Sequence, residues 1–193
     1  MSGIEVSAII SEFASDSDNR ADKAAQALAS AGLDNLAIFS RLLIDQNADV
    51  RWWAVRSMAE IQSPEITPLL LQTLNDSDIS VRQCAALALQ EQPDSRAVPA
   101  LIQSLNSADQ LLARIAGNAL IAIGGDAVPA LLEVMENGPH NARLGAARAL
   151  GLIGDTRAIP ELIKALDGES AILEHWAGEG LEKMGVGMIY FKA

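Results

Sequence analysis

The chain contains few of the side chains that most often act in catalysis or metal binding, and their spacing does not favour either. The sequence contains two histidines, His140 and His175, and one cysteine, Cys84. Neither histidine has a second one three or four residues away, the spacing that brings two imidazoles to one helix face around a metal ion. Cys84 lies beside positions expected in the core, so we interpret it as a small buried apolar residue. The sequence predicts no catalytic, cofactor-binding or metal-ligating residues.

Charge and composition narrow the classes of partner. The 193 residues include 14 Lys and Arg against 25 Asp and Glu, which gives a formal net charge of −11. Phosphate backbones bind basic surfaces, so we expect no nucleic acid partner. A single cysteine excludes an intrachain disulfide and favours a reducing compartment. Without a secretory leader or a run of about 18 apolar residues, we expect a cytoplasmic protein that does not span a membrane.

Any recognition surface must be positioned by the helices that an internal repeat predicts. Residues of one register recur every 30 or 31 positions, at Ala21, Arg51, Arg82, Ala113, Arg143 and Glu174. Three positions after each of these register marks stands an alanine: Ala24, Ala54, Ala85, Ala116, Ala146 and Ala177. Small residues recur six positions after each mark, and the residue seven positions after it is mainly leucine. Positions three and seven after the mark, together with the mark itself, fall on one face of an α-helix. Each repeat therefore contains a helix whose buried face is built largely from small side chains.

Prolines predict another helix earlier in each repeat. Four of them recur at the same spacing, at Pro68, Pro99, Pro129 and Pro160, where the missing amide hydrogen is harmless in the first turn of a helix. Glycines at 32, 124, 154 and 185 follow the alanine-bearing helix and are expected to end it. We call the helix that begins near the proline the first helix of its repeat, and the helix with the alanine series the second helix.

The predicted fold is all-α, a single domain over residues 1–193 in which about six two-helix repeats of 30–31 residues form an α-solenoid. Each helix pair exposes an apolar face that it cannot bury alone, so neighbouring repeats build one continuous core. The expected repeats span residues 4–32, 33–62, 63–93, 94–124, 125–154 and 155–185. Residues 186–193 are expected to cap the last repeat. Their apolar part, 186–191, is alternatively a site of weak self-association in an otherwise monomeric chain.

These repeats resemble those of a known family. Segments 75–89, with its Val81-Arg82 step, and 142–155 are similar to HEAT repeats. They resemble in particular the short subtype named after phycobilisome (PBS) lyases. The resemblance implies an armadillo/HEAT-like α-α superhelix whose second helices line a concave docking surface. It also implies one enzymatic possibility, a bilin lyase subunit or phycobiliprotein chaperone.

Positions one and five residues after the register marks should point away from the core on the second helices. The candidate partner-binding residues at these positions are Trp52, Arg56, Gln83, Leu87, Arg114, Asn118, Arg148, His175 and Glu179. The four middle second helices carry six arginines against two glutamates, which indicates a mildly basic surface that attracts an acidic protein or peptide. The resemblance implies that Arg51, Arg82 and Arg143, which match the Val-Arg step, instead bond groups in the loops.

Trp52 and Trp53 point in different directions, because consecutive helical residues lie about 100° apart. One ring is expected to pack between repeats while the other faces outward. We expect Trp52 to be the outward ring, since tryptophan and arginine dominate interface hot spots. The alternative is that it only covers a neighbouring side chain.

The sequence as a whole predicts a non-catalytic protein-interaction module or scaffold that binds an acidic protein or peptide on its concave surface. The bilin lyase subunit or phycobiliprotein chaperone is the alternative from the enzyme class. A further alternative is a HEAT-like DNA glycosylase, which also uses tryptophan and arginine on a concave face. A pI near 4.5 is unfavourable for binding DNA.

Overall fold

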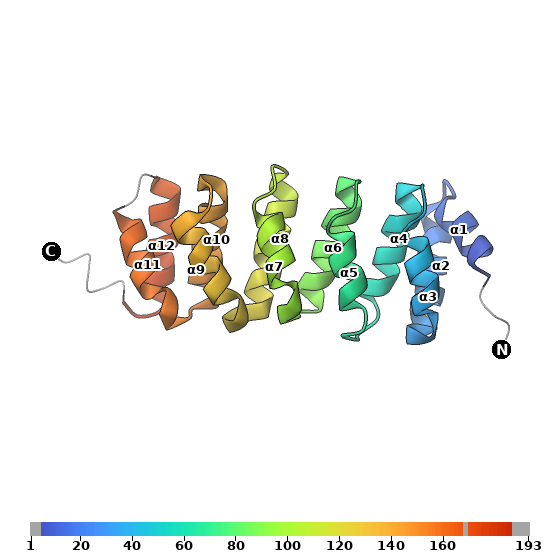
Figure 1. Ribbon diagram of the computed structural model, residues 1–193, viewed down its shortest axis with the longest axis horizontal. Helices are drawn as coiled ribbons and strands as arrows, with labels where there is room; N and C mark the ends of the chain where they lie inside the picture. The colour runs from blue at the N-terminus through green and yellow to red at the C-terminus, as the bar shows by residue number, and fades with distance from the viewer. Residues whose placement is uncertain (1–4, 168–169, 187–193) are drawn as a thin grey trace. The chain divides into compact units, whose positions relative to one another are not determined.

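The computed structural model describes residues 5–167 and 170–186, and in these ranges the chain is all-helical (Figure 1). The first helices of the repeats are α1 (Val6–Phe13), α3 (Leu36–Leu42), α5 (Thr67–Thr73), α7 (Val98–Leu105), α9 (Val128–Asn137) and α11 (Ile159–Leu166). The second helices are α2 (Asp18–Ser30), α4 (Ala48–Ala59), α6 (Ile79–Glu91), α8 (Gln110–Ile123), α10 (His140–Ile153) and α12 (Ala171–Lys183). Short 3-10 helices precede four of the first helices: η1 (Gly32–Asn35), η2 (Ser95–Ala97), η3 (Gly124–Ala127) and η4 (Thr156–Ala158). The predicted all-α repeat architecture is confirmed.

The described helices group into two compact units, one that ends at residue 92 and one that begins at residue 93. We call them the first and the second unit. Within the first unit α4 packs against both α2 and α6, and within the second unit α10 packs against both α8 and α12. The assignment of residues 1–193 to a single domain stays a prediction, and the expected capping segment lies outside the described residues from position 187 onward.

Small side chains let the second helices of one unit pack closely. Five alanines of the predicted series are fully buried: Ala54, Ala85, Ala116, Ala146 and Ala177. The leucine series seven positions after the register marks is buried with them, from Leu28 to Leu181. Close-packed interiors tolerate little change in volume, so these positions hold neighbouring helices in a fixed register.

In the second unit α10 and α12 approach each other closely, where two glycines face each other. A Cβ atom added to Gly180 would lie 2.6 Å from the Cα of Gly151, and one added to Gly151 would lie 3.0 Å from the Cα of Gly180. The backbones of α10 and α12 therefore touch at this point, and any side chain would push them apart.

The helices end where the sequence predicts. Gly32, Gly124, Gly154 and Gly185 all have positive φ angles, between 64° and 78°, which other residues rarely adopt. The four repeated prolines lie in the first turns of α5, α7, α9 and α11. The stretch Gln110–Asn137 is long and apolar enough by composition to cross a membrane. It is divided by η3 into helices of 14 and 10 residues, each shorter than the roughly 20 residues that a span needs.

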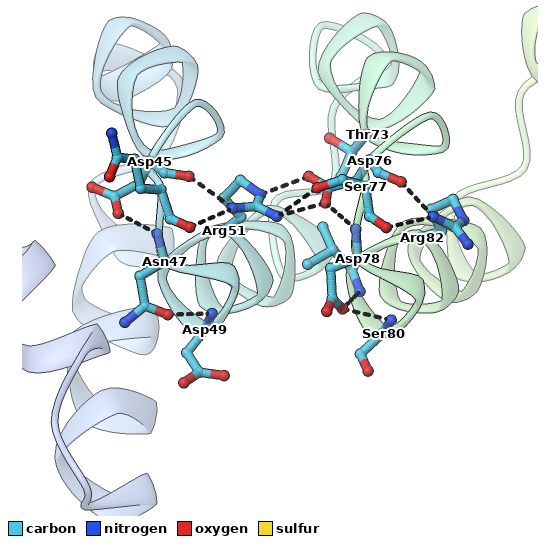
Figure 2. Close-up of polar contacts among 12 residues, drawn as sticks. Asp45, Asn47, Asp49, Arg51, Thr73, Asp76, Ser77, Asp78, Ser80 and Arg82 are labelled. Atoms are coloured by element: carbon cyan, nitrogen blue, oxygen red, sulfur yellow. Dashed lines mark hydrogen bonds and ion pairs between the residues drawn. The ribbon is translucent and has the colours of Figure 1, made fainter.

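Polar loops join α3 to α4 and α5 to α6, and they are built in the same way (Figure 2). In the second of these loops the Asp78 carboxylate accepts hydrogen bonds from the amides of Ser80 and Val81 and caps α6. Asn47 plays the corresponding part for α4 by accepting from the amide of Asp49 at 2.9 Å. These caps satisfy amides that the first turn of a helix leaves unpaired.

An arginine joins these loops across the repeats. Arg51, only 8% exposed, donates from Nε and Nη2 to the carboxylate of Asp76 at 2.7 and 2.8 Å, and from Nη1 to the carbonyl of Asp45 at 2.8 Å (Figure 2). Arg82 donates to the carbonyls of Asp76 and Ser77 in the loop before its own helix. The resemblance implied this loop-bonding role for Arg51, Arg82 and Arg143, but the buried Nε of Arg143 has no hydrogen-bond partner among the described residues.

The electrostatic balance at Asp76 favours its charged form. Burial by itself would raise the pKa of Asp76, but the hydrogen bonds from Arg51 and from the Asp78 amide, with the nearby guanidinium charges, outweigh it. The pKa of Asp76 therefore lies below its usual value, and the ionised carboxylate stabilises the folded state.

We predict that Asp76→Asn lowers the free energy of unfolding by about 2–4 kcal/mol at pH 7, between the values for exposed and for buried ion pairs. The pKa of Asp76 is lower in the folded state than in the unfolded state, where it is about 3.9. The stability that the Asp76 carboxylate contributes is therefore complete above the unfolded pKa and is lost as the pH falls through the folded pKa. Urea unfolding of both proteins from pH 7 to pH 3 should show their difference shrink below about pH 4. A difference that does not change with pH would contradict the prediction. Glu12→Gln, in an exposed pair with Arg20, is the control and should change little.

We also predict that Gly180→Ala lowers the free energy of unfolding by about 1–3 kcal/mol, because the new methyl group overpacks the contact with Gly151. Gly117→Ala on α8 is the matched control. There an added Cβ would meet Leu105 at an ordinary 3.5 Å, and alanine favours a helix over glycine by about 1 kcal/mol. Urea unfolding followed by circular dichroism distinguishes the two variants, and equal effects would disprove the close approach.

Candidate interaction surface

The second helices of each unit leave one face uncovered by the core. It carries the residues one, five and nine positions after each register mark, a helical spacing that keeps them on one side. In the first unit we define the first-unit surface as Trp52, Arg56, Glu60, Gln83, Leu87 and Glu91. In the second unit we define the second-unit surface as Arg114, Asn118, Leu144, Arg148, Leu152, His175, Glu179 and Lys183. All of these residues are half-buried or exposed, so all nine sequence candidates lie on one of the two surfaces.

Two side chains of the first-unit surface, Arg56 and Trp52, are engaged with neighbours on their own helix. Arg56 forms an ion pair with Glu60 one helical turn away, and this hydrogen bond raises the pKa of Arg56. The ring of Trp53 stacks on the buried Phe13, with centroids 6.3 Å apart, while Trp52 meets Trp53 edge to face at 4.9 Å. Trp53 thus packs between helices as one of the two rings was expected to do, and Trp52 is half-buried rather than fully exposed.

Cys84 lies beside this cluster, below the first-unit surface, with its Sγ 4.0 Å from the carbonyl oxygen of Trp52. Burial raises the pKa of Cys84 to about 12, so the thiol stays protonated at neutral pH. The described residues hold no group of three or more His, Cys, Asp and Glu side chains placed to bind a metal ion. On the first-unit surface the side chains around Trp52 are packed against their neighbours, and the charge of Arg56 is neutralised by Glu60.

The second-unit surface carries more unpaired positive charge. Arg114 is exposed and forms no hydrogen bond or ion pair with the part of the chain that the structure describes. Arg148 donates from Nη1 to Oδ1 of Asn118 at 2.9 Å, and its guanidinium carbon lies 5.7 Å from the centroid of the Trp176 ring. The surface carries three cations, Arg114, Arg148 and Lys183, against one carboxylate, that of Glu179.

Two hollows adjoin the Arg148–Trp176 pair, and both residues line both of them. We call the first the α8–α10 hollow; it has a volume of about 340 Å³, and its lining includes Arg114, Gly117, Leu144 and Gly145. The second, the α10–α12 hollow, measures about 310 Å³ and is lined also by Leu152, Glu179 and Lys183. The arginine–tryptophan pair thus stands between two open depressions on a single surface.

The structure divides the sequence candidates and adds to them. Five of the candidates lie in the second unit: Arg114, Asn118, Arg148, His175 and Glu179. The other four lie in the first unit: Trp52, Arg56, Gln83 and Leu87. Sequence reasoning missed Trp176, Leu152 and Lys183 as surface residues. Leu152 and Lys183 lie four residues after candidates at the fifth position, so the helical period itself could have found them.

Comparison with known proteins agrees with the repeat architecture. Residues 35–121 and 98–182 match the model of the HEAT repeats family. Similar solved structures include the complex of CpcE and CpcF of phycocyanin lyase from Nostoc sp. PCC7120, with 22% identity, a TM-score of 0.51 and coverage of 96% of this chain and 79% of that one. A designed armadillo repeat protein in complex with the peptide (KR)4 has 18% identity and a TM-score of 0.52, over 94% of this chain and all of the other. An engineered protein has 21% identity and a TM-score of 0.51, over 96% and 98% of the two chains. No curated protein matches the sequence.

We predict that Cys84 resists alkylation in the folded protein. With a pKa of about 12 in place of about 8.5, the fraction of thiolate at pH 8 falls on the order of 10³-fold. Mass spectrometry after iodoacetamide treatment, in buffer and in urea, measures the two rates. Equal rates would show that the thiol is accessible and contradict its burial.

Proposed function

The chain belongs to the HEAT-repeat family, and on that premise we propose that it is a non-catalytic protein-interaction module that binds an acidic protein or peptide on its helical surface. The site is the second-unit surface, which we expect to lie on the concave side of the array. One observation carries the proposal: in a chain of net charge −11, this surface presents an Arg114 with no bonded partner among the described residues and an Arg148 in cation–π contact with Trp176. A local positive field of this kind attracts acidic partners and repels basic ones.

The fold supports binding of an extended partner. A designed armadillo repeat protein of similar fold has been solved with the peptide (KR)4, so a surface of stacked helices is able to hold a peptide. That peptide is basic, whereas the cations of the second-unit surface favour the opposite charge in a partner of this chain. Tryptophan and arginine are also the residue types that contribute most to binding at protein interfaces.

We expect the double variant Arg114→Ala, Arg148→Ala to lose acidic proteins that the unaltered chain retains from a lysate, because both guanidinium groups are removed from the surface. Arg56→Ala is the matched control, since Arg56 is already neutralised by Glu60. Mass spectrometry of the retained proteins compares the three chains. The proposal fails if the double variant retains the same proteins as the control.

The bilin lyase subunit or phycobiliprotein chaperone is the second candidate. One observation favours it: the fold is shared with the phycocyanin lyase complex over 96% of this chain. Fold similarity alone does not transfer an activity, and no acid, base or nucleophile stands out on either surface. A visible absorption band that shifts on mixing the protein with a linear tetrapyrrole would support this candidate. For the DNA glycosylase, a gel shift with duplex DNA is the corresponding check, and the acidic composition favours no binding.

A further inference from the structure

The two hollows of the second-unit surface differ in charge although they share the Arg148–Trp176 pair. The α8–α10 hollow is lined by Arg114 and Arg148 and, among the described residues, by no carboxylate. The α10–α12 hollow combines Arg148 and Lys183 with Glu179 and Glu182. Lys183 is also engaged, since its Nζ donates to the carbonyl oxygen of Leu152 at 3.0 Å. A carboxylate is therefore stabilised in the first hollow and has no net attraction to the second.

Arg148 is held in the orientation that carboxylate binding needs. Its Nη1 donates to Asn118 and its guanidinium carbon lies 5.7 Å from the centroid of the Trp176 ring, so these two contacts restrict the side chain before a partner arrives. Its Nε and Nη2 donors bond no group in the part of the chain described here. Two parallel N–H donors match the two oxygens of a carboxylate, and an ordered side chain loses little entropy on binding.

The α10–α12 hollow instead suits an apolar side chain. Leu152 is 38% exposed on its wall, and the ring of Trp176 supplies a second apolar surface. Gly151 and Gly180, at which the backbones of the two helices touch, also line this hollow and add no side chains to it. Filling it with an apolar group removes this surface from water, which is favourable.

Resting on the proposed function, the geometry points to an extended acidic peptide with two anchors as the occupant. A glutamate or aspartate side chain occupies the α8–α10 hollow against Arg114 and Arg148, and a bulky apolar side chain occupies the α10–α12 hollow against Leu152 and Trp176. Neighbouring packed helices lie about 8–10 Å apart, and an extended chain rises about 3.3 Å per residue. The two anchors are therefore two to three residues apart in the partner.

The test uses the full chain and a series of labelled synthetic peptides, each with one glutamate and one phenylalanine in a serine–glycine background. The series varies the spacing between the two residues and their order, and fluorescence polarisation measures the dissociation constant. We expect tightest binding at a spacing of two or three residues. Replacing the glutamate by glutamine should weaken binding about 10- to 100-fold, the effect of losing hydrogen bonds to a charged group.

Protein variants assign the two anchors to their hollows. Arg148→Ala should reduce the difference between glutamate and glutamine peptides, and the double variant Arg114→Ala, Arg148→Ala should abolish it, whereas Leu152→Glu, at an exposed position, should abolish the preference for phenylalanine. Arg56→Ala should change neither. Circular dichroism confirms that each variant is folded, so a loss of binding is not mistaken for a loss of structure.

The possible results separate this inference from the proposed function. Binding that depends on the glutamate and on Arg148, but not on the phenylalanine or its spacing, overturns the two-anchor assignment and leaves the proposed function standing. The same holds if no peptide binds while acidic proteins are still captured through Arg114 and Arg148. If that capture is also independent of the two arginines, both proposals fail.

Discussion

Close packing of the second helices through small side chains is the constraint on which the rest of the second unit depends. Ala146 and Ala177 are fully buried, and Gly151 and Gly180 let the backbones of α10 and α12 touch. This close packing brings together surface residues that are about one repeat apart in sequence. Asn118 and Arg148 are hydrogen-bonded at 2.9 Å, and Arg148 in turn lies over the ring of Trp176. The arrangement of the second-unit surface is thus a product of the packing beneath it.

Arginines of the same repeated helix stand in three different settings, which their immediate partners decide. Arg51 is bonded to the Asp76 carboxylate and to loop carbonyls, so its charge holds repeats together. Arg56 is neutralised by Glu60 on its own helix. Arg114 and Arg148 have no acidic partner among the described residues, so their charge is available on the surface. A count of arginines over several helices therefore overestimates the charge that a partner meets.

The sequence predicts the fold well because the same pattern of residues that packing requires recurs in six repeats. The buried alanines, the prolines in first turns and the glycines with positive φ are local requirements that can be inferred from spacing alone. The candidate site was predicted only in part. The helical period places Arg114, Asn118 and Arg148 on the surface. It does not place Trp176 there, because the same position of the repeat holds Trp53 and Cys84 in the first unit, and these two side chains pack inward. On α10 that position is occupied by Gly145, and without a side chain there the hollow beside Trp176 stays open. Such an effect depends on the neighbouring helix and cannot be inferred from one repeat.

We propose that partners bind the second-unit surface rather than the first, and the three tryptophans of the chain allow a direct measurement. In a two-dimensional ¹⁵N–¹H spectrum each indole N–H gives one signal, so a titration with an acidic peptide reports on Trp52, Trp53 and Trp176 separately. We expect the Trp176 signal to shift and saturate with the bound fraction, together with the Nε–H signal of Arg148, while the signals of Trp52 and Trp53 stay in place. Shifts at Trp52 or Trp53 with an unchanged Trp176 would contradict binding at the second-unit surface.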